Sequence, residues 1–232
     1  MHAIRRIIAT AALISAATSA HSAVTITYGG SADIASGYTY SNALVSGTVS
    51  VNSFTGGLPA TYTPPIGGVV VSGSLDGLDR APFGNNGTDQ YLSLPSPNPS
   101  EQFLTYGMTF TPGAAQTYFG MYWGSIDAYN EVRFYKGLNL VASMNGAQIS
   151  ASNYIDGSAA ANNPSAYVNF FFTGGDTYDR VVLVSSQYAF ESDNHAFGTA
   201  APVPEPSEWA MMIAGLGIVG LIARKRRQHA AR

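Results

Sequence analysis

Residues 116–144 read QTYFGMYWGSIDAYNEVRFYKGLNLVASM, and this stretch decides the fold class. Aromatic and β-branched residues gather in three short runs, at 116–123, 130–135 and 138–144. Such runs predict β-strands, and the stretch lacks the apolar spacing of an amphipathic helix. The dipeptide Lys136-Gly137 predicts a turn between the last two strands. The stretch therefore predicts consecutive antiparallel strands.

The same pattern continues on both sides of this stretch, from Val24 to Thr199. Short runs are broken by Gly, Asn, Asp and Pro, as expected for strands joined by turns. The further expected strands are 24–28, 44–50, 69–75, 90–94, 103–111, 167–172, 180–186 and 188–195. Regularly spaced short strands without intervening helices predict one antiparallel β-sandwich, and we expect this all-β domain to span residues 24–200.

The composition agrees with this fold class. Only 11% of the 232 residues are charged, against about 25% in an average globular protein, whereas Gly (25), Tyr (14) and Phe (11) are abundant. Such a mixture disfavours both an intrinsically disordered chain and a helical bundle. Cysteine is absent, which excludes disulfides, thiolate metal sites and cysteine nucleophiles.

Charge is segregated along the chain. Between Val24 and Val203 there are four basic and twelve acidic residues, while basic residues cluster at the two ends. Phosphate backbones would repel such an acidic body, so we expect no nucleic-acid partner.

The amino-terminal segment has the layout of a signal peptide. A basic start at 1–6 is followed by an apolar run at 7–17 and by small residues at 18–23. This order predicts export, with a signal helix removed after Ala20 or Ala23. The apolar run is too short to span a membrane comfortably.

The carboxyl-terminal segment 201–232 has three parts, and the first is the motif 204–210. Its prolines keep the chain extended and stop a helix from propagating backwards. The second part is an apolar run that predicts a membrane helix over 209–223, with Trp209 at the membrane–water interface. Such a helix would rise about 22 Å, and snorkelling and local thinning can cover the rest of the roughly 30 Å hydrocarbon core.

The third part of this segment is the basic tail 224–232. Four consecutive bases predict that the carboxyl terminus stays in the cytoplasm and that the preceding domain lies outside. This anchor cluster consists of Arg224, Lys225, Arg226 and Arg227. Within the apolar run, 215–220 matches the dinucleotide pattern G-x-G-x-x-G, but no strand precedes it, so we expect no dinucleotide site.

This segment resembles the PEP-CTERM sorting signal in its PEPxxWA form. The resemblance lies in the Gly-spaced apolar run, the basic cluster and the motif residues Pro204, Glu205, Pro206, Trp209 and Ala210. It implies that an exosortase of a Gram-negative bacterium recognises Pro-Glu-Pro in a precursor anchored transiently in the inner membrane. Cleavage or transfer would then deliver the protein to the cell surface or to an extracellular matrix of exopolysaccharide. Such tails are also called ice-binding protein C-terminal domains, a name that is no evidence of ice binding.

Two segments of the body resemble exosortase-dependent surface proteins. Residues 123–130, WGSIDAYN, are similar to their WGS-x-D-x-YN hairpin, and residues 190–194, FESDN, to their closing F-E-x-D-N strand. Jelly-roll, lectin-like domains close in a similar way, so the resemblance implies a sandwich of that kind. We expect Trp123 to be buried and Asp127 to accept hydrogen bonds from loop N–H groups.

Candidate catalytic chemistry is sparse. His195 is the one histidine of the body, and without a G-x-S-x-G elbow we interpret it as a surface or strand-end residue. Sequence cannot place two carboxylates at the roughly 5–9 Å that glycoside hydrolysis needs. The candidates for such a pair are Asp127, Glu131, Glu191 and Asp193. We therefore expect a non-enzymatic surface or matrix protein, with no catalytic residue. A lectin-like adhesin is the first alternative and a glycan hydrolase the second.

Cofactor and ligand signals are equally weak. Asp127 with Asn130, or Asp176 with Asp179, offer the hard oxygen ligands that calcium prefers, but EF-hand spacing is absent. No cofactor is predicted, and a structural calcium ion stays an open alternative. Five aromatic residues could form a sugar-stacking face, although in strands such residues are more often core: Tyr118, Tyr122, Trp123, Tyr129 and Tyr135.

Overall fold

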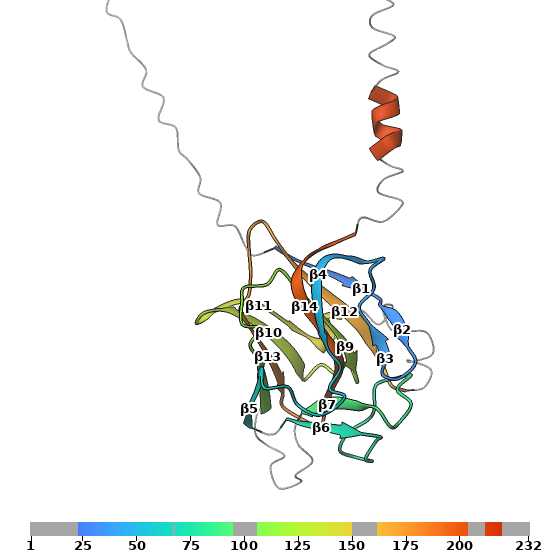
Figure 1. Ribbon diagram of the computed structural model, residues 1–232, viewed down its shortest axis with the longest axis vertical. Coiled ribbons are helices and arrows are strands. Elements are labelled where there is room, and N and C mark those ends of the chain that lie inside the picture. The colour runs from blue at the N-terminus through green and yellow to red at the C-terminus, as the bar shows by residue number, and fades with distance from the viewer. Residues whose placement is uncertain (1–22, 67, 95–105, 150–161, 204–211, 220–232) are drawn as a thin grey trace, which may run out of the picture.

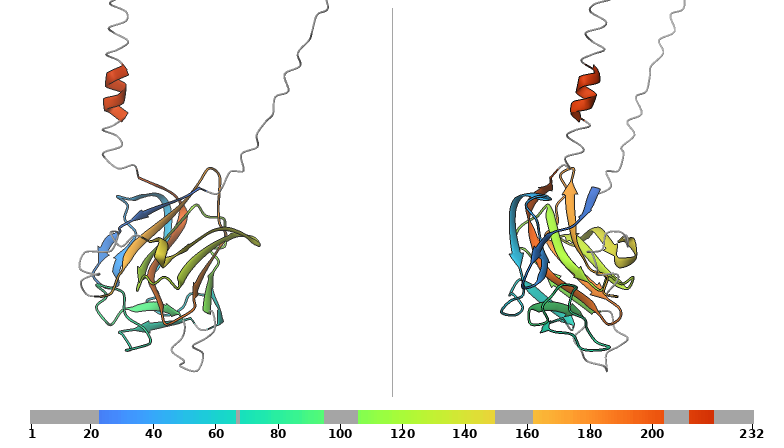
Figure 2. Two further views of the ribbon diagram at one scale, coloured as in Figure 1. Left: turned by 180° about the vertical axis from the view of Figure 1, so that it is seen from behind. Right: turned by 90° about the vertical axis from the view of Figure 1, so that its right-hand side faces the viewer.

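The computed structural model describes residues 23–66, 68–94, 106–149, 162–203 and 212–219 (Figure 1). Two antiparallel sheets account for most of these residues, and their core faces pack against each other (Figures 1 and 2). In the side view of Figure 2, β4 (cyan) lies on the opposite layer from β11 (yellow). The prediction of an all-β domain with antiparallel sheets is confirmed.

The larger sheet has seven strands in the order β1-β12-β9-β14-β7-β6, and β4 also pairs with β14. The strands are β1 Ala23–Tyr28, β4 Val45–Asn52, β6 Val69–Ser72, β7 Gln90–Leu94, β9 Tyr118–Gly124, β12 Ala166–Thr173 and β14 Phe190–Pro202. β14 is central: β9 pairs with one side of it, and β7 and then β4 pair with the other side.

The smaller sheet has five strands in the order β11-β10-β13-β8-β5. They are β5 Tyr62–Ile66, β8 Tyr106–Phe110, β10 Asn130–Lys136, β11 Asn139–Asn145 and β13 Arg180–Ser185. A separate hairpin joins β2 Ser31–Asp33 to β3 Gly37–Thr39, and a 3₁₀ turn covers Gly146–Gln148.

The three runs that decide the fold class are β9, β10 and β11, and their bounds agree with the predicted runs to within two residues. β2, β3 and β5 are strands that the sequence pattern did not predict. The predicted strand 188–195 begins later and runs seven residues further than expected, because β4 pairs with residues 195–202 of β14. Part of the predicted strand 103–111 lies outside the described residues.

The main core lies between the two sheets and is rich in phenylalanine. Phe119 of β9 packs against Phe134 of β10 with ring centroids 5.7 Å apart, and Phe134 packs against Phe170 of β12 at 5.2 Å. All three side chains are buried. Because such aromatic contacts need residues from both layers, the core holds the sheets face to face.

A second, smaller cluster covers the outer face of the larger sheet. Tyr118, Tyr122, Tyr167 and Phe171 are buried there beneath the amino-terminal strands. Gly37 of β3 lies so close that a Cβ would come within 2.6 Å of the Tyr122 ring, and its φ is +87°. Only glycine fits both the contact and the backbone angle.

The register of β14 changes at Asn194. Its pairing with β9 shifts between Asp193 and Ala196, and Asn194 has a left-handed φ of 47°. This bulge keeps Ser192 and His195 on the core face, while Glu191 and Asp193 lie on the outer face. One extra residue therefore decides which polar groups of β14 meet the core.

Residues 1–22 of the predicted signal peptide 1–23 fall outside the described residues, as do 204–211 and 220–232, while Ala23 is the first residue of β1. Residues 212–219, part of the predicted membrane helix 209–223, form a helix whose side chains are all exposed. Within the described part of the chain, no helix is both long enough and apolar enough to cross a membrane.

Candidate functional site

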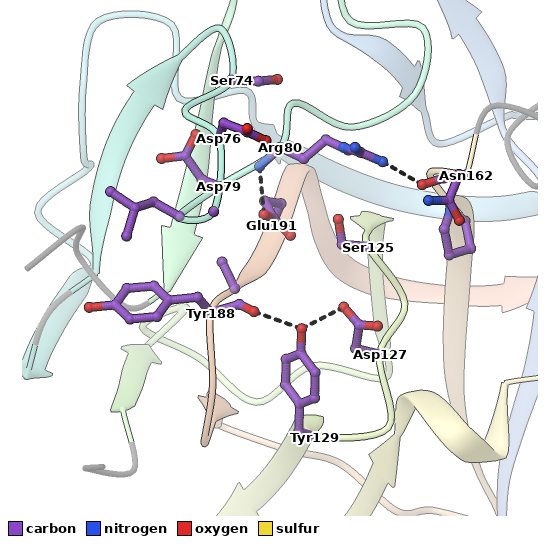
Figure 3. Close-up of a pocket in the computed structure, with 14 residues that line it drawn as sticks. Ser74, Asp76, Asp79, Arg80, Ser125, Asp127, Tyr129, Asn162, Tyr188 and Glu191 are labelled. Atoms are coloured by element: carbon purple, nitrogen blue, oxygen red, sulfur yellow. Dashed lines mark hydrogen bonds between the residues drawn. The ribbon is translucent and has the colours of Figure 1, made fainter. Parts of the chain in front are cut away.

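A polar pocket of about 540 Å³ lies at one end of the larger sheet (Figure 3). Three segments line most of it: the loop 74–80, the turn 125–129 after β9, and residues 188–191 at the start of β14. These segments meet because Gly124, the last residue of β9, pairs with Glu191 of β14. The turn and the beginning of β14 therefore open on the same side of the sheet.

The loop 74–80 is held closed by Asp79. Its Oδ1 accepts hydrogen bonds from the Leu75 N–H and from the Tyr91 hydroxyl, both at 3.0 Å. The Arg80 N–H donates to Glu191 Oε1 at 2.8 Å, which ties the loop to β14. The loop is thus fixed at both ends, and its polar side chains are held over the pocket.

The pocket is predominantly acidic. Four carboxylates line it, those of Asp76, Asp79, Asp127 and Glu191, together with one guanidinium, that of Arg80. Arg80 Nη1 donates to the carbonyl oxygen of Asn162. Because Asp76, Asp79 and Asp127, besides the buried Glu191, stand against one cation, the pocket favours positively charged ligands or groups that donate hydrogen bonds.

The Tyr129 hydroxyl joins two walls of the pocket. It lies 2.8 Å from Asp127 Oδ2 and 2.8 Å from the carbonyl oxygen of Tyr188 (Figure 3). The predicted hydrogen-bond donors to the Asp127 carboxylate, the N–H groups of the loop, are wrong. The donor is the Tyr129 hydroxyl, because the turn brings Tyr129 back over this carboxylate.

Glu191 is the most deeply buried acid of the pocket, with 1% of its surface exposed. Burial raises its pKa to about 8, against the opposing effects of the Arg80 N–H and the Ser125 hydroxyl. Its Oε2 accepts no hydrogen bond of normal geometry. The pKa of Asp127 is also raised by burial, which the Tyr129 hydroxyl partly opposes. The pocket therefore contains a carboxylic acid that holds its proton at neutral pH.

The structure separates the four carboxylates that the sequence offered as a catalytic pair. Asp127 and Glu191 line the same pocket. Glu131 lies on β10, in the smaller sheet, and forms an ion pair with Arg133 at 2.6 Å. Asp193 is fully buried on the outer face of β14, where burial raises its pKa to about 8.

His195 lies in the main core, and its interpretation as a surface or strand-end residue is wrong. Its Nδ1 is 2.8 Å from the Tyr62 hydroxyl, its Nε2 is 2.9 Å from the Ser192 hydroxyl, and its ring packs against Phe119. Burial lowers the pKa of His195 to about 3, so the ring is neutral. The bulge at Asn194 turns this histidine inward, which the sequence pattern alone did not reveal.

The five aromatic candidates do not form one exposed row. Tyr118, Tyr122 and Trp123 are fully buried. Tyr129 borders the pocket, and Tyr135 packs beneath the Arg180 guanidinium, 4.2 Å from the ring centroid. The interpretation of these residues as core and cross-strand partners holds for the three buried side chains.

In each calcium pair that the sequence offered, one member already accepts hydrogen bonds. Asn130 Oδ1 accepts from the Ser185 hydroxyl at 2.7 Å, and both carboxylate oxygens of Asp179 accept from the Gly137 N–H. Among the described residues, no three His, Asp or Glu side chains come together as a metal site.

The acidic loop 74–80 was not predicted to take part in a site. The only signal in the sequence is that Asp76, Asp79 and Arg80 lie within five residues beside glycines. Loops of this composition are ordinary turns unless another segment meets them.

Residues 202–227 match the family model of the PEP-CTERM protein-sorting motif. The chain carries a PEP-CTERM sorting signal. The motif residues 204–210 and the basic cluster 224–227 fall within the matched range, and their individual roles stay predictions. These residues lie outside the described part of the structure.

A comparison with curated proteins finds no match. Among solved structures, the K2 cleaved adhesin domain of Lys-gingipain is similar, with 15% identity and a TM-score of 0.40. The alignment covers 65% of this chain and 98% of that chain. A TM-score of this size carries no argument about function.

Proposed function

We propose that this PEP-CTERM protein is an exported, non-enzymatic component of the cell surface or of an exopolysaccharide matrix, processed by an exosortase. The observation that carries the proposal is the sorting motif at residues 202–227. In this arrangement the β-sandwich precedes the motif, so it reaches the far side of the inner membrane before the exosortase acts. The matured domain then works outside the cell.

The described side chains argue against a Ser–His hydrolase. Ser192 and His195 lie beside each other but are fully buried in the core, where no substrate can reach them. The acidic pocket is open and rests on hydrogen bonds that the loop and strands make among themselves. These features suit a domain that presents a stable surface to its surroundings.

Sorting is tested by two variants within the motif. Glu205→Ala changes the central residue of Pro-Glu-Pro, and Glu208→Ala is the matched control, because it removes the same side chain at a position that the PEPxxWA pattern leaves variable. Each is expressed in a host that contains an exosortase. The carboxyl terminus is then identified by mass spectrometry of the inner-membrane and secreted fractions.

We expect Glu205→Ala to accumulate as uncleaved precursor in the inner membrane, while Glu208→Ala matures as the unaltered protein does. Normal maturation of Glu205→Ala would overturn the proposed recognition of Pro-Glu-Pro.

The second candidate is a lectin-like adhesin, and the pocket favours it. Its volume of about 540 Å³ lies within the range of small-ligand sites, and carboxylates accept hydrogen bonds from sugar hydroxyls. A glycan-array screen of the mature protein tests this candidate. Asp76→Asn should lose any glycan bound in the pocket, whereas Asp176→Asn, outside the pocket, should retain it.

A further inference from the structure

A second group of acids lies on the outer face of the larger sheet and includes none of the residues that line the pocket. Asp193 of β14 is fully buried; its Oδ1 accepts the Asn194 N–H at 2.7 Å, and its Oδ2 has no hydrogen-bond partner. Asp89, just before β7, also has a buried oxygen, Oδ2, without a partner. A buried carboxylate oxygen without a partner is costly, and here there are two.

The strand register places these two acids together. Ser192 pairs with Leu92, so Asp193 comes level with Tyr91, the next residue outward on β7. Asp89 is two residues before Tyr91 and therefore on the same face of the strand. Asp193 and Asp89 are thus diagonal neighbours on adjacent strands, with side chains on one face of the sheet.

Their surroundings contain more negative charge and no compensating base. The charges of Asp89 and of Asp33, at the end of β2, both act on Asp193. Within the described ranges, the one ion pair is that of Arg133 with Glu131, on the smaller sheet. Arg80 is engaged at the acidic pocket, and Arg180 stacks on Tyr135 and donates to the Gly137 carbonyl.

The side chain of Asn194, next to Asp193, holds the β2–β3 hairpin in place near the two acids. The Asn194 side chain donates to the Ser36 hydroxyl at 2.8 Å and to the Tyr38 carbonyl at 2.7 Å, which joins β14 to the β2–β3 hairpin. The backbone of Ser36 also bridges to Asn85, in the loop that leads to Asp89. Three segments that are far apart in the sequence therefore converge on the two acids.

We propose that Asp193 and Asp89 hold a calcium ion that clamps the β2–β3 hairpin and the loop 85–89 onto the larger sheet. Calcium takes six to eight oxygen ligands and accepts carboxylates, carbonyls and water in flexible geometry. Two carboxylates suffice when main-chain and water oxygens fill the remaining positions. A divalent cation bound to both carboxylates would partner both orphaned oxygens and offset their negative charge.

Thermal unfolding of the mature protein, first treated with EDTA and then titrated with CaCl₂, tests this site. We expect calcium to raise the Tm, because a ligand that binds only the folded state stabilises it. Terbium, which replaces calcium, should show tyrosine-sensitised luminescence, since Tyr91 and Tyr122 are buried on the same face.

Asp89→Asn and Asp193→Asn keep the side-chain shape and should remove the calcium-dependent rise in Tm and most of the luminescence. Asp193→Asn should still fold without calcium, with a Tm no lower than that of the calcium-free unaltered protein, because a neutral amide replaces a buried carboxyl group that has an unpartnered oxygen. Asp76→Asn and Asp127→Asn, in the acidic pocket, are the matched controls and should retain both signals.

Three results would overturn the site: no calcium effect on the unaltered protein, unchanged calcium responses in both Asp89→Asn and Asp193→Asn, or loss of the response in the pocket variants instead.

Discussion

Trp123 stacks on Phe190 with ring centroids 4.9 Å apart and ring planes 19° from parallel. The two residues lie on the adjacent strands β9 and β14, and both side chains are fully buried in the main core. The contact joins the two segments that resemble exosortase-dependent surface proteins, WGSIDAYN and FESDN. It also shows that Trp123 is a core residue rather than a ligand platform.

Trp123→Ala should lower the free energy of unfolding by about 3–5 kcal/mol, the usual cost of deleting a large buried aromatic side chain. Trp123→Phe should cost less, because it keeps a ring against Phe190 and removes an indole N–H that has no partner. Leu138→Ala is the control, since Leu138 is 94% exposed. Urea titration measures all three, and an unchanged midpoint for Trp123→Ala would contradict its place in the core.

Gly37→Ala should destabilise the domain more than Gly77→Ala does. Both glycines have a left-handed φ, +87° and +75°, so alanine is strained at either position. Only Gly37 also faces a close neighbour, the Tyr122 ring, whereas nothing lies within 4 Å of a Cβ on Gly77. Overpacking should add about 1–3 kcal/mol at Gly37. Equal losses in thermal unfolding would show that the hairpin does not pack on Tyr122 in solution.

The stability of the domain should fall as the pH rises from about 4.5 to about 8. Glu191 ionises near its ordinary pKa of 4.5 when unfolded but near 8 when folded. Between these values the unfolded state loses its proton first, so Glu191 alone lowers the free energy of unfolding by about 1.4 kcal/mol per pH unit. Asp193, whose pKa is also raised to about 8, adds to this slope, and His195 opposes it below pH 6.5. Glu191→Gln should reduce the slope by its own share in EDTA-containing buffer, while the exposed Asp76→Asn should leave it unchanged. Urea titrations across this pH range measure the slope, and equal slopes for Glu191→Gln and the unaltered protein would exclude a buried, protonated Glu191.

His195 should stay neutral throughout mild acid. Its folded pKa is lowered to about 3 from an ordinary value of 6.5, so it contributes stability that is complete above pH 6.5 and is lost as the pH falls toward 3. It is the single histidine between residues 24 and 203, so its ring proton signals in an NMR spectrum are unambiguous. These signals should not shift between pH 8 and pH 5. A titration with a midpoint near 6.5 would mean that the ring is exposed to water.

The basic cluster should fix the orientation of the precursor. Replacing Arg224, Lys225, Arg226 and Arg227 by Ala should expose a carboxyl-terminal tag on the outer side of the inner membrane, because positive charge near an apolar run keeps it cytoplasmic. Protease treatment of spheroplasts measures the exposure. A tag that stays protected would show that another feature sets the orientation.

The fold class and the sorting signal could both be predicted from residues that are close together in the sequence. β9, β10 and β11 were predictable because strand formation in 116–144 depends on runs of aromatic and β-branched residues and on turn residues that are adjacent in the sequence. The motif at 202–227 was equally readable, since its prolines, apolar run and basic cluster occupy one continuous segment.

Tertiary structure decided which polar residues meet. The pocket needs loop 74–80, the turn after β9 and the start of β14, and the proposed calcium site needs Asp89 beside Asp193. Both depend on pairings of β14 with β7 and β9, about 100 and 70 residues earlier in the chain. The bulge at Asn194 then decides which side chains of β14 point into the core and which point to the outer face. A shift of one position in a strand moves each side chain to the opposite face of the sheet.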